Sequence, residues 1–107
     1  MELHHIGIAV TNIEATAKFY CTMGYVLTET IEDKIQNVYI AFLENERGRL
    51  ELVQLVDKTS PVCNILKKIG VSAYHFCYET NDFYSTIMKL EKKRVQSIGI
   101  ACKCNWI

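Results

Sequence analysis

The sequence predicts an α+β fold in which two paired βαβββ modules form one cupped mixed β-sheet, with the second module shortened at its C-terminal end. The first observation is an internal repeat, because residues 3–24 and 73–94 each read as an apolar strand followed by an amphipathic helix. The second is a set of further apolar strands that follows the first copy. We expect a single domain over residues 1–107, with a first module at about 3–56, a linker helix at about 60–70 and a second, incomplete module at about 73–107.

The first copy opens with an apolar strand at residues 3–10 and continues into a helix that Asn12 can cap. Gly24 suits the end of that helix, because glycine readily adopts the backbone conformation that terminates helices. Three later segments are rich in β-branched and other apolar residues and are predicted as strands, with a polar turn around Gly48: residues 25–32, 38–43 and 50–56.

The linker helix is predicted from Ser60 and Pro61, which suit the cap and the first position of a helix, and from Gly70, which suits its end. The second copy then gives a strand at residues 73–80 and a second helix after Asp82. Asp82 occupies the position that Asn12 holds in the first copy. Both copies therefore predict the same strand–cap–helix unit.

Composition narrows the function classes. The chain has 107 residues, 50% of them hydrophobic, which is enough for a core. Its 12 basic and 12 acidic residues balance, so no electrostatic footprint for nucleic acid is visible. No apolar run approaches the ~20 residues that span a bilayer, and the N-terminus does not resemble a signal peptide. Five irregularly spaced cysteines argue against a disulfide framework. We expect a cytoplasmic protein that binds neither nucleic acid nor membranes.

Three polar side chains lie on otherwise apolar strands: His5, Glu51 and His75. A carboxylate on a buried strand is costly unless it is paired, hydrogen-bonded or bound to a metal. Two imidazoles and a carboxylate suit Zn, Mn, Fe, Co or Ni. The residues alone leave two interpretations open, a metal site or core histidines with a solvent-facing glutamate, because no short metal-binding motif is present.

Six segments, taken in order, resemble the vicinal oxygen chelate superfamily of glyoxalases, bleomycin-resistance proteins and dioxygenases: HHIGIAV, KFYCTMGY, QNVYIAFLE, LELVQ, SPVCNILKKIG and YHFCYETND. The resemblance is strongest to its methylmalonyl-CoA epimerase and glyoxalase I branch. It implies that His5 rather than His4, together with Glu51 and His75, ligates a divalent metal ion, which would be Zn, Mn, Co, Ni, Fe or Mg.

The fourth ligand of that family is a glutamate near the end of the second module. No acidic residue follows Glu91 here, and Cys102 and Cys104 are the alternative ligands, set against ordinary terminal cysteines. The general base is not identifiable, although Glu79 shares a strand face with His75.

The resemblance implies a metal-dependent isomerase or lyase, in which the ion stabilises an enolate during proton transfer next to a carbonyl. The implied substrate is a small molecule such as an acyl-CoA or a 2-oxoaldehyde adduct. Two alternatives remain, a metal-free binding module like the bleomycin-resistance proteins and a truncated inactive paralogue. We further expect a homodimer whose contact includes residues 95–107, with Trp106 as an anchor, because open sheet edges invite pairing.

Overall fold

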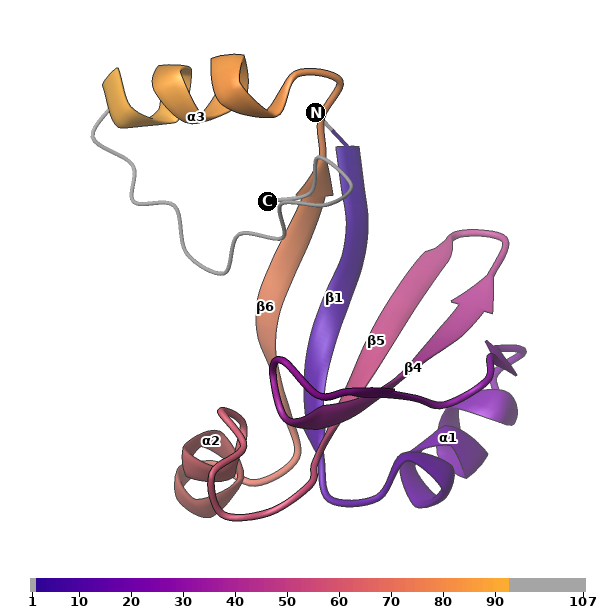
Figure 1. Ribbon diagram of the computed structural model, residues 1–107. Coiled ribbons are helices and arrows are strands. Elements are labelled where there is room, and N and C mark those ends of the chain that lie inside the picture. The colour runs from indigo at the N-terminus through magenta and orange to yellow at the C-terminus, as the bar shows by residue number, and fades with distance from the viewer. Residues whose placement is uncertain (1, 93–107) are drawn as a thin grey trace.

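The structure, a computed structural model, describes residues 2–92, with the backbone alone at residues 83 and 90–92 (Figure 1). It has an α+β fold with a six-stranded mixed sheet. The strands are β1 (Glu2–Val10), β2 (Val26–Leu27), β3 (Ile31–Asp33), β4 (Val38–Asn45), β5 (Gly48–Leu55) and β6 (Ser72–Glu79). The helices are α1 (Ile13–Cys21), α2 (Cys63–Lys68) and α3 (Phe83–Lys92).

Strand β1 joins β6 to the rest of the sheet, which consists of β2 to β5. The strand order is β2-β4-β5-β1-β6, and β3 also pairs with β4. Because β1 runs parallel to β5 and antiparallel to β6, the sheet is mixed. Figure 1 shows β1 between β5 and β6. The N-terminal strand therefore lies beside residues 50–54 of β5 on one side and residues 72–79 of β6 on the other.

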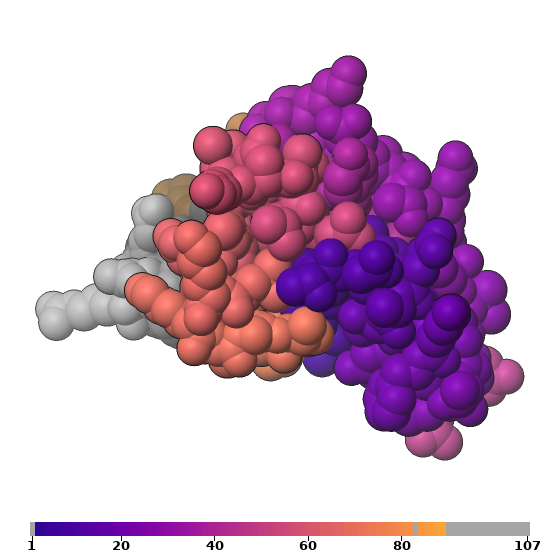
Figure 2. Space-filling view, turned by 90° about the horizontal axis from the view of Figure 1, so that it is seen from below, coloured from indigo at the N-terminus to yellow at the C-terminus, as the bar shows by residue number. Residues whose placement is uncertain are grey.

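The two faces of the sheet bury separate clusters. On one face Ile13 and Ala17 of α1 pack against strand residues Ile8, Val10, Ala41, Leu43 and Leu52. On the other face Val62 packs against Ala9, Val38 and Val53, with Ile65 and Leu66 of α2 alongside. Figure 2 shows the molecule from below the view of Figure 1, where α2 and the start of β6 (rose to salmon) lie beside β1 and α1 (indigo to purple). Alternation along β1 therefore sends Ile8 and Val10 to the α1 face and Ala9 to the α2 face.

The two strand–helix units begin their helices in the same way. The Asn12 side chain accepts a hydrogen bond from the backbone N–H of Ala15 at 2.9 Å, as a helix N-cap does. The Asp82 carboxylate accepts the equivalent bond from Ser85 at 3.0 Å. The equivalence of Asn12 and Asp82 that the sequence predicts thus has a structural counterpart.

The predicted strand at residues 25–32 is two short strands, β2 and β3, which lie along the same edge of β4. The interruption begins at Thr28, whose hydroxyl accepts the hydrogen bond of the Phe42 backbone N–H at 2.8 Å. A side chain therefore takes the place of a main-chain acceptor, and the regular ladder stops there. β-propensity alone does not reveal this substitution.

The prediction that Ser60 caps the linker helix is wrong. Helix α2 begins at Cys63 with Val62 before it and has no side-chain cap, so it is shorter than residues 60–70. Ser60 is buried, and its hydroxyl donates to the backbone carbonyl of Asn37 while accepting from the Val56 N–H at 2.8 Å. The hydroxyl is thus used to hold the loop after β5 against the start of β4.

Some predictions lie outside the described residues. They are the C-terminal part of the second module, the cysteines 102 and 104, and the dimer contact at residues 95–107 with Trp106. Within residues 2–92, none of the helices has the length and apolar character needed to cross a membrane.

Candidate metal centre

Three neighbouring strands each contribute one residue to the candidate site. His5 comes from β1, Glu51 from β5 and His75 from β6. In the sheet register Gly7 pairs with Glu51 on one side and with His75 on the other. His5 lies two positions before Gly7, and residues two apart project from the same face of a strand. The pairing therefore brings residues 5, 51 and 75 to one face of the sheet.

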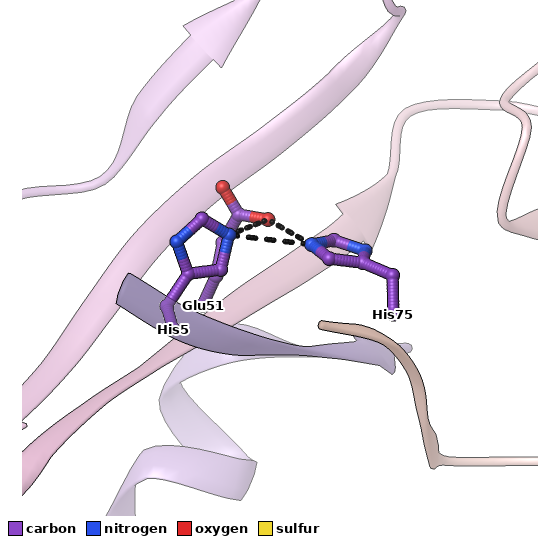
Figure 3. Close-up of side chains that lie close together, drawn as sticks. All are labelled: His5, Glu51 and His75. Atoms are coloured by element: carbon purple, nitrogen blue, oxygen red, sulfur yellow. Dashed lines mark hydrogen bonds and ion pairs between the residues drawn. The ribbon is translucent and has the colours of Figure 1, made fainter. Parts of the chain in front are cut away.

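The three side chains point toward one another (Figure 3). His5 Nε2 lies 3.5 Å from Glu51 Oε1, and His75 Nε2 lies 3.3 Å from the same oxygen. The two Nε2 atoms are 3.3 Å apart. The donor atoms thus form a nearly equilateral triangle.

The size of this triangle fits a divalent ion. Metal bonds of about 2.1 Å separate adjacent ligand atoms by about 3.0 Å in an octahedron and about 3.4 Å in a tetrahedron. The observed separations of 3.3–3.5 Å match these values without any side chain having to move far. Two imidazole nitrogens and one carboxylate oxygen on one face of a coordination sphere leave the opposite positions open for water or substrate. The group of His5, Glu51 and His75 could therefore hold a metal ion.

Gly7 provides the space that the site needs. A Cβ atom built on Gly7 would overlap the imidazole ring of His75. The ring consequently lies across the backbone of β1, which is a close approach that only glycine permits. In a strand, such a glycine is a packing requirement rather than a flexible point.

Burial differs across the site. The exposed fractions are 3% for His5, 13% for Glu51 and 27% for His75. The ring of Phe42 contacts His5 edge-on at a centroid distance of 5.4 Å, and Tyr74 contacts His75 at 4.4 Å. The site is therefore closed behind His5 and reached from the side of His75.

The environment favours an ionised Glu51. Burial alone would raise the pKa of this carboxyl group, but hydrogen bonds from His5 and then His75, together with the charges of the two rings, lower the pKa to about 2. Carboxylates bind metals in the ionised form. Burial, and secondarily the charge of Glu51, raise the pKa of the Tyr74 phenol.

The structure brings together the three residues that the sequence singled out, while their role as metal ligands stays a prediction. Glu79, the carboxylate considered as a base, is exposed and pairs with Glu2 at the far end of β6. Sequence reasoning missed Gly7. A glycine two positions after a strand histidine is the signal that could have found it, because glycine inside a strand marks a close approach.

Comparison with known proteins is consistent with this geometry. The family model described as Glyoxalase/Bleomycin resistance protein/Dioxygenase superfamily matches residues 4–101. The chain belongs to this superfamily. The match covers all three site residues and both strand–helix units.

Named relatives in the superfamily include methylmalonyl-CoA epimerases. The human mitochondrial enzyme is 28% identical over 99 residues, which are 91% of this chain and 56% of that protein. The structure of a hypothetical protein from Bacillus halodurans superposes with a TM-score of 0.86 at 28% identity, covering 96% of this chain and 78% of that one. A Streptomyces coelicolor methylmalonyl-CoA epimerase in complex with 2-nitronate-propionyl-CoA superposes with a TM-score of 0.76 at 28% identity, covering 90% and 74%. The chain thus spans little more than half the length of the human relative.

Proposed function

We propose that this chain is a metal-dependent isomerase or lyase of the glyoxalase and methylmalonyl-CoA epimerase type, which moves a proton next to a carbonyl group. The observation that carries the proposal is the triangle of donor atoms from His5, Glu51 and His75, with its 3.3–3.5 Å edges. The relationship to methylmalonyl-CoA epimerases supports the reaction class.

The donor set suits an anionic transition state. A divalent ion at this site would supply a Lewis acid for the carbonyl oxygen on which negative charge develops. Glu51 contributes the single negative charge of the triad, so the loaded site keeps a net positive charge. Burial of His5 beneath Phe42 excludes water behind the site and strengthens electrostatic interactions inside it. The more exposed His75 leaves the substrate a way in.

A small coenzyme A thioester is the substrate that the relatives favour. The Streptomyces coelicolor epimerase is in complex with 2-nitronate-propionyl-CoA, and a further epimerase structure contains methylmalonyl-CoA. Both ligands are acyl-CoA thioesters, and in methylmalonyl-CoA the carbon next to the thioester carries an acidic hydrogen. We extend this substrate class to the present chain, with the adduct of a 2-oxoaldehyde and a thiol as the second substrate to test.

Deuterium exchange tests the proposal directly. The purified protein is loaded with Co²⁺ or Mn²⁺ and incubated in D₂O with methylmalonyl-CoA, and mass spectrometry follows the thioester. We expect a gain of one mass unit faster than in buffer alone, because the proton next to the carbonyl is removed and replaced. His75→Ala, which removes one donor, is the matched variant and should exchange at the buffer rate.

The outcomes separate the alternatives. Absence of exchange with either substrate, in protein shown by elemental analysis to hold the ion, would overturn the proposal. Thioester binding by metal-free protein with no exchange would instead support a binding module of the bleomycin-resistance kind. A protein that shows neither thioester binding nor deuterium exchange would point to an inactive paralogue.

A further inference from the structure

A line of hydrogen bonds connects the surface to the candidate metal centre. Arg49 Nη1 lies 2.6 Å from His4 Nε2, and His4 Nδ1 lies 2.8 Å from His5 Nδ1. His5 Nε2 in turn faces the Glu51 carboxylate and the His75 ring. Four side chains are thus joined in one line, in the order Arg49, His4, His5 and Glu51.

The chemistry of Arg49 sets the direction of this line. A guanidinium group only donates hydrogen bonds, so His4 Nε2 must accept. A neutral imidazole has one N–H, which places the proton of His4 on Nδ1 and makes it a donor to His5 Nδ1. His5 then carries its own proton on Nε2, pointing at Glu51. Every bond in the line is satisfied in this direction.

This placement of the protons is incompatible with metal binding through His5 Nε2. His5 can ligate through Nε2 only with that nitrogen unprotonated, and its proton then belongs on Nδ1, where a ligating histidine normally donates to a neighbour. His4 would have to accept at Nδ1 and carry its proton on Nε2. That proton would face the N–H groups of Arg49, and two donors cannot share a hydrogen bond.

We propose that the Arg49–His4 pair holds His5 in the tautomer that cannot bind a metal, and that ion binding reverses the tautomers of both histidines and releases Arg49 from His4. His4 and Arg49 are positioning residues that regulate the site. The inference rests on the metal site of the proposed function and adds a control of its affinity.

Arg49 has a second partner to which it can turn. Arg49 Nε lies 3.5 Å from Glu44 Oε2, and the two residues are directly paired across β4 and β5. Both side chains are partly exposed, so Arg49 can leave His4 without losing its contact with solvent or with a carboxylate. Release of Arg49 therefore leaves no buried charge unpaired.

The ring nitrogens of histidine report the reversal. The chain has three histidines, so a sample labelled with ¹⁵N in histidine gives a simple spectrum. In metal-free protein we expect His4 to carry its proton on Nδ1, and in zinc-loaded protein on Nε2. His4→Phe identifies the His4 signals by their loss. A His4 that keeps its proton on Nδ1 after zinc binding would overturn the inference.

Zinc affinity measured against a competing chelator gives the second readout. Arg49→Met should tighten zinc binding by about tenfold, which is the size of change in metal affinity usually seen when a hydrogen-bonding partner of a metal ligand is altered. Arg47→Met is the matched control, because it removes the same charge from an exposed position in the adjacent turn. In a His4→Phe background Arg49→Met should have no effect, since Arg49 acts through His4.

The outcomes distinguish this inference from the function it rests on. Equal zinc affinity in the wild type and Arg49→Met, or a gain that persists in the His4→Phe background, would overturn the inference while leaving the metal site intact. Failure of every variant to bind zinc would overturn both.

Discussion

The imidazole of His75 lies directly over Gly7, its partner in the pairing of β1 with β6. On its other side Gly7 is in register with Glu51 of β5. The glycine therefore sits between two of the three donors, and its missing side chain is the room that the His75 ring occupies. The position ties the packing of the sheet to the geometry of the site.

Gly7→Ala should destabilise the protein by about 1–3 kcal/mol, the usual cost of forcing extra atoms into a packed site. The added methyl group would push the His75 ring away, so metal affinity should fall as well. Chemical denaturation of the metal-free protein measures the first effect, and titration with zinc measures the second.

The control is the same substitution in a His75→Ala background. The three atoms nearest to a Cβ at Gly7 all belong to the His75 ring and are absent in this background, and alanine is intrinsically no worse than glycine in a strand. We expect most of the destabilisation to disappear. A cost that is unchanged in this background would show that the His75 ring is not the obstacle.

A divalent ion should raise the unfolding temperature of the wild-type protein by several degrees. An ion that binds only the folded state at 100 times its dissociation constant adds about 2.7 kcal/mol of stability. Differential scanning calorimetry with and without Zn²⁺ measures the rise, and a chelator should reverse it. His75→Ala should show little of the rise, because one of the three donors is lost.

His4→Ala provides the comparison. His4 is next to His5 in sequence but does not belong to the triangle of donors, so this variant should still be stabilised by the ion. An equal loss of the effect in His4→Ala and His75→Ala would point to adventitious binding by exposed imidazoles.

The internal repeat relates two of the three residues of the candidate site, while Glu51 lies outside the repeat. His5 and His75 occupy equivalent positions 70 residues apart, and the two strands that carry them pair in the sheet. The capping residues Asn12 and Asp82 repeat the correspondence one element later. A pattern that recurs with its local structure thus carries information about distant contacts.

Other features depend on contacts that local sequence does not encode. The register of β1 against β6 shifts between Leu3 and His5 and again between Gly7 and Ile8, and these shifts decide which side chains meet. The contact of Arg49 with His4 depends on the parallel pairing of β1 and β5. The prediction of Ser60 as a helix cap was wrong because of another distant contact. Its hydroxyl donates a hydrogen bond to the carbonyl of Asn37, 23 positions away in sequence.

We expect a homodimer in solution. Within the described residues β6 is the last strand of the sheet on its side, and Phe76 on this strand is 60% exposed. Open strand edges with exposed aromatic residues favour association. Sedimentation velocity should detect the dimer, and Phe76→Glu should lower its fraction. Ile35→Glu, at a position 88% exposed in the turn between β3 and β4, is the control that should not. A chain that stays monomeric at every concentration would contradict the prediction.

The metal-free protein should lose stability in acid through Glu51. The pKa of this carboxyl group is lowered from 4.5 to about 2 in the folded state, so unfolding raises its proton affinity. A lowered pKa in the folded state contributes stability that is fully present above pH 4.5 and is lost as the pH falls toward about 2.

Glu51→Gln isolates this contribution, because glutamine has the same shape and does not titrate in this range. The free energy of unfolding of the wild type minus that of Glu51→Gln, measured by urea denaturation in the presence of a chelator, should be largest above pH 4.5 and should shrink toward pH 2. A difference that stays constant across this range would mean that His5 and His75 do not stabilise the ionised carboxylate. The same variant should also weaken zinc binding, since it removes the only negative charge among the three donors.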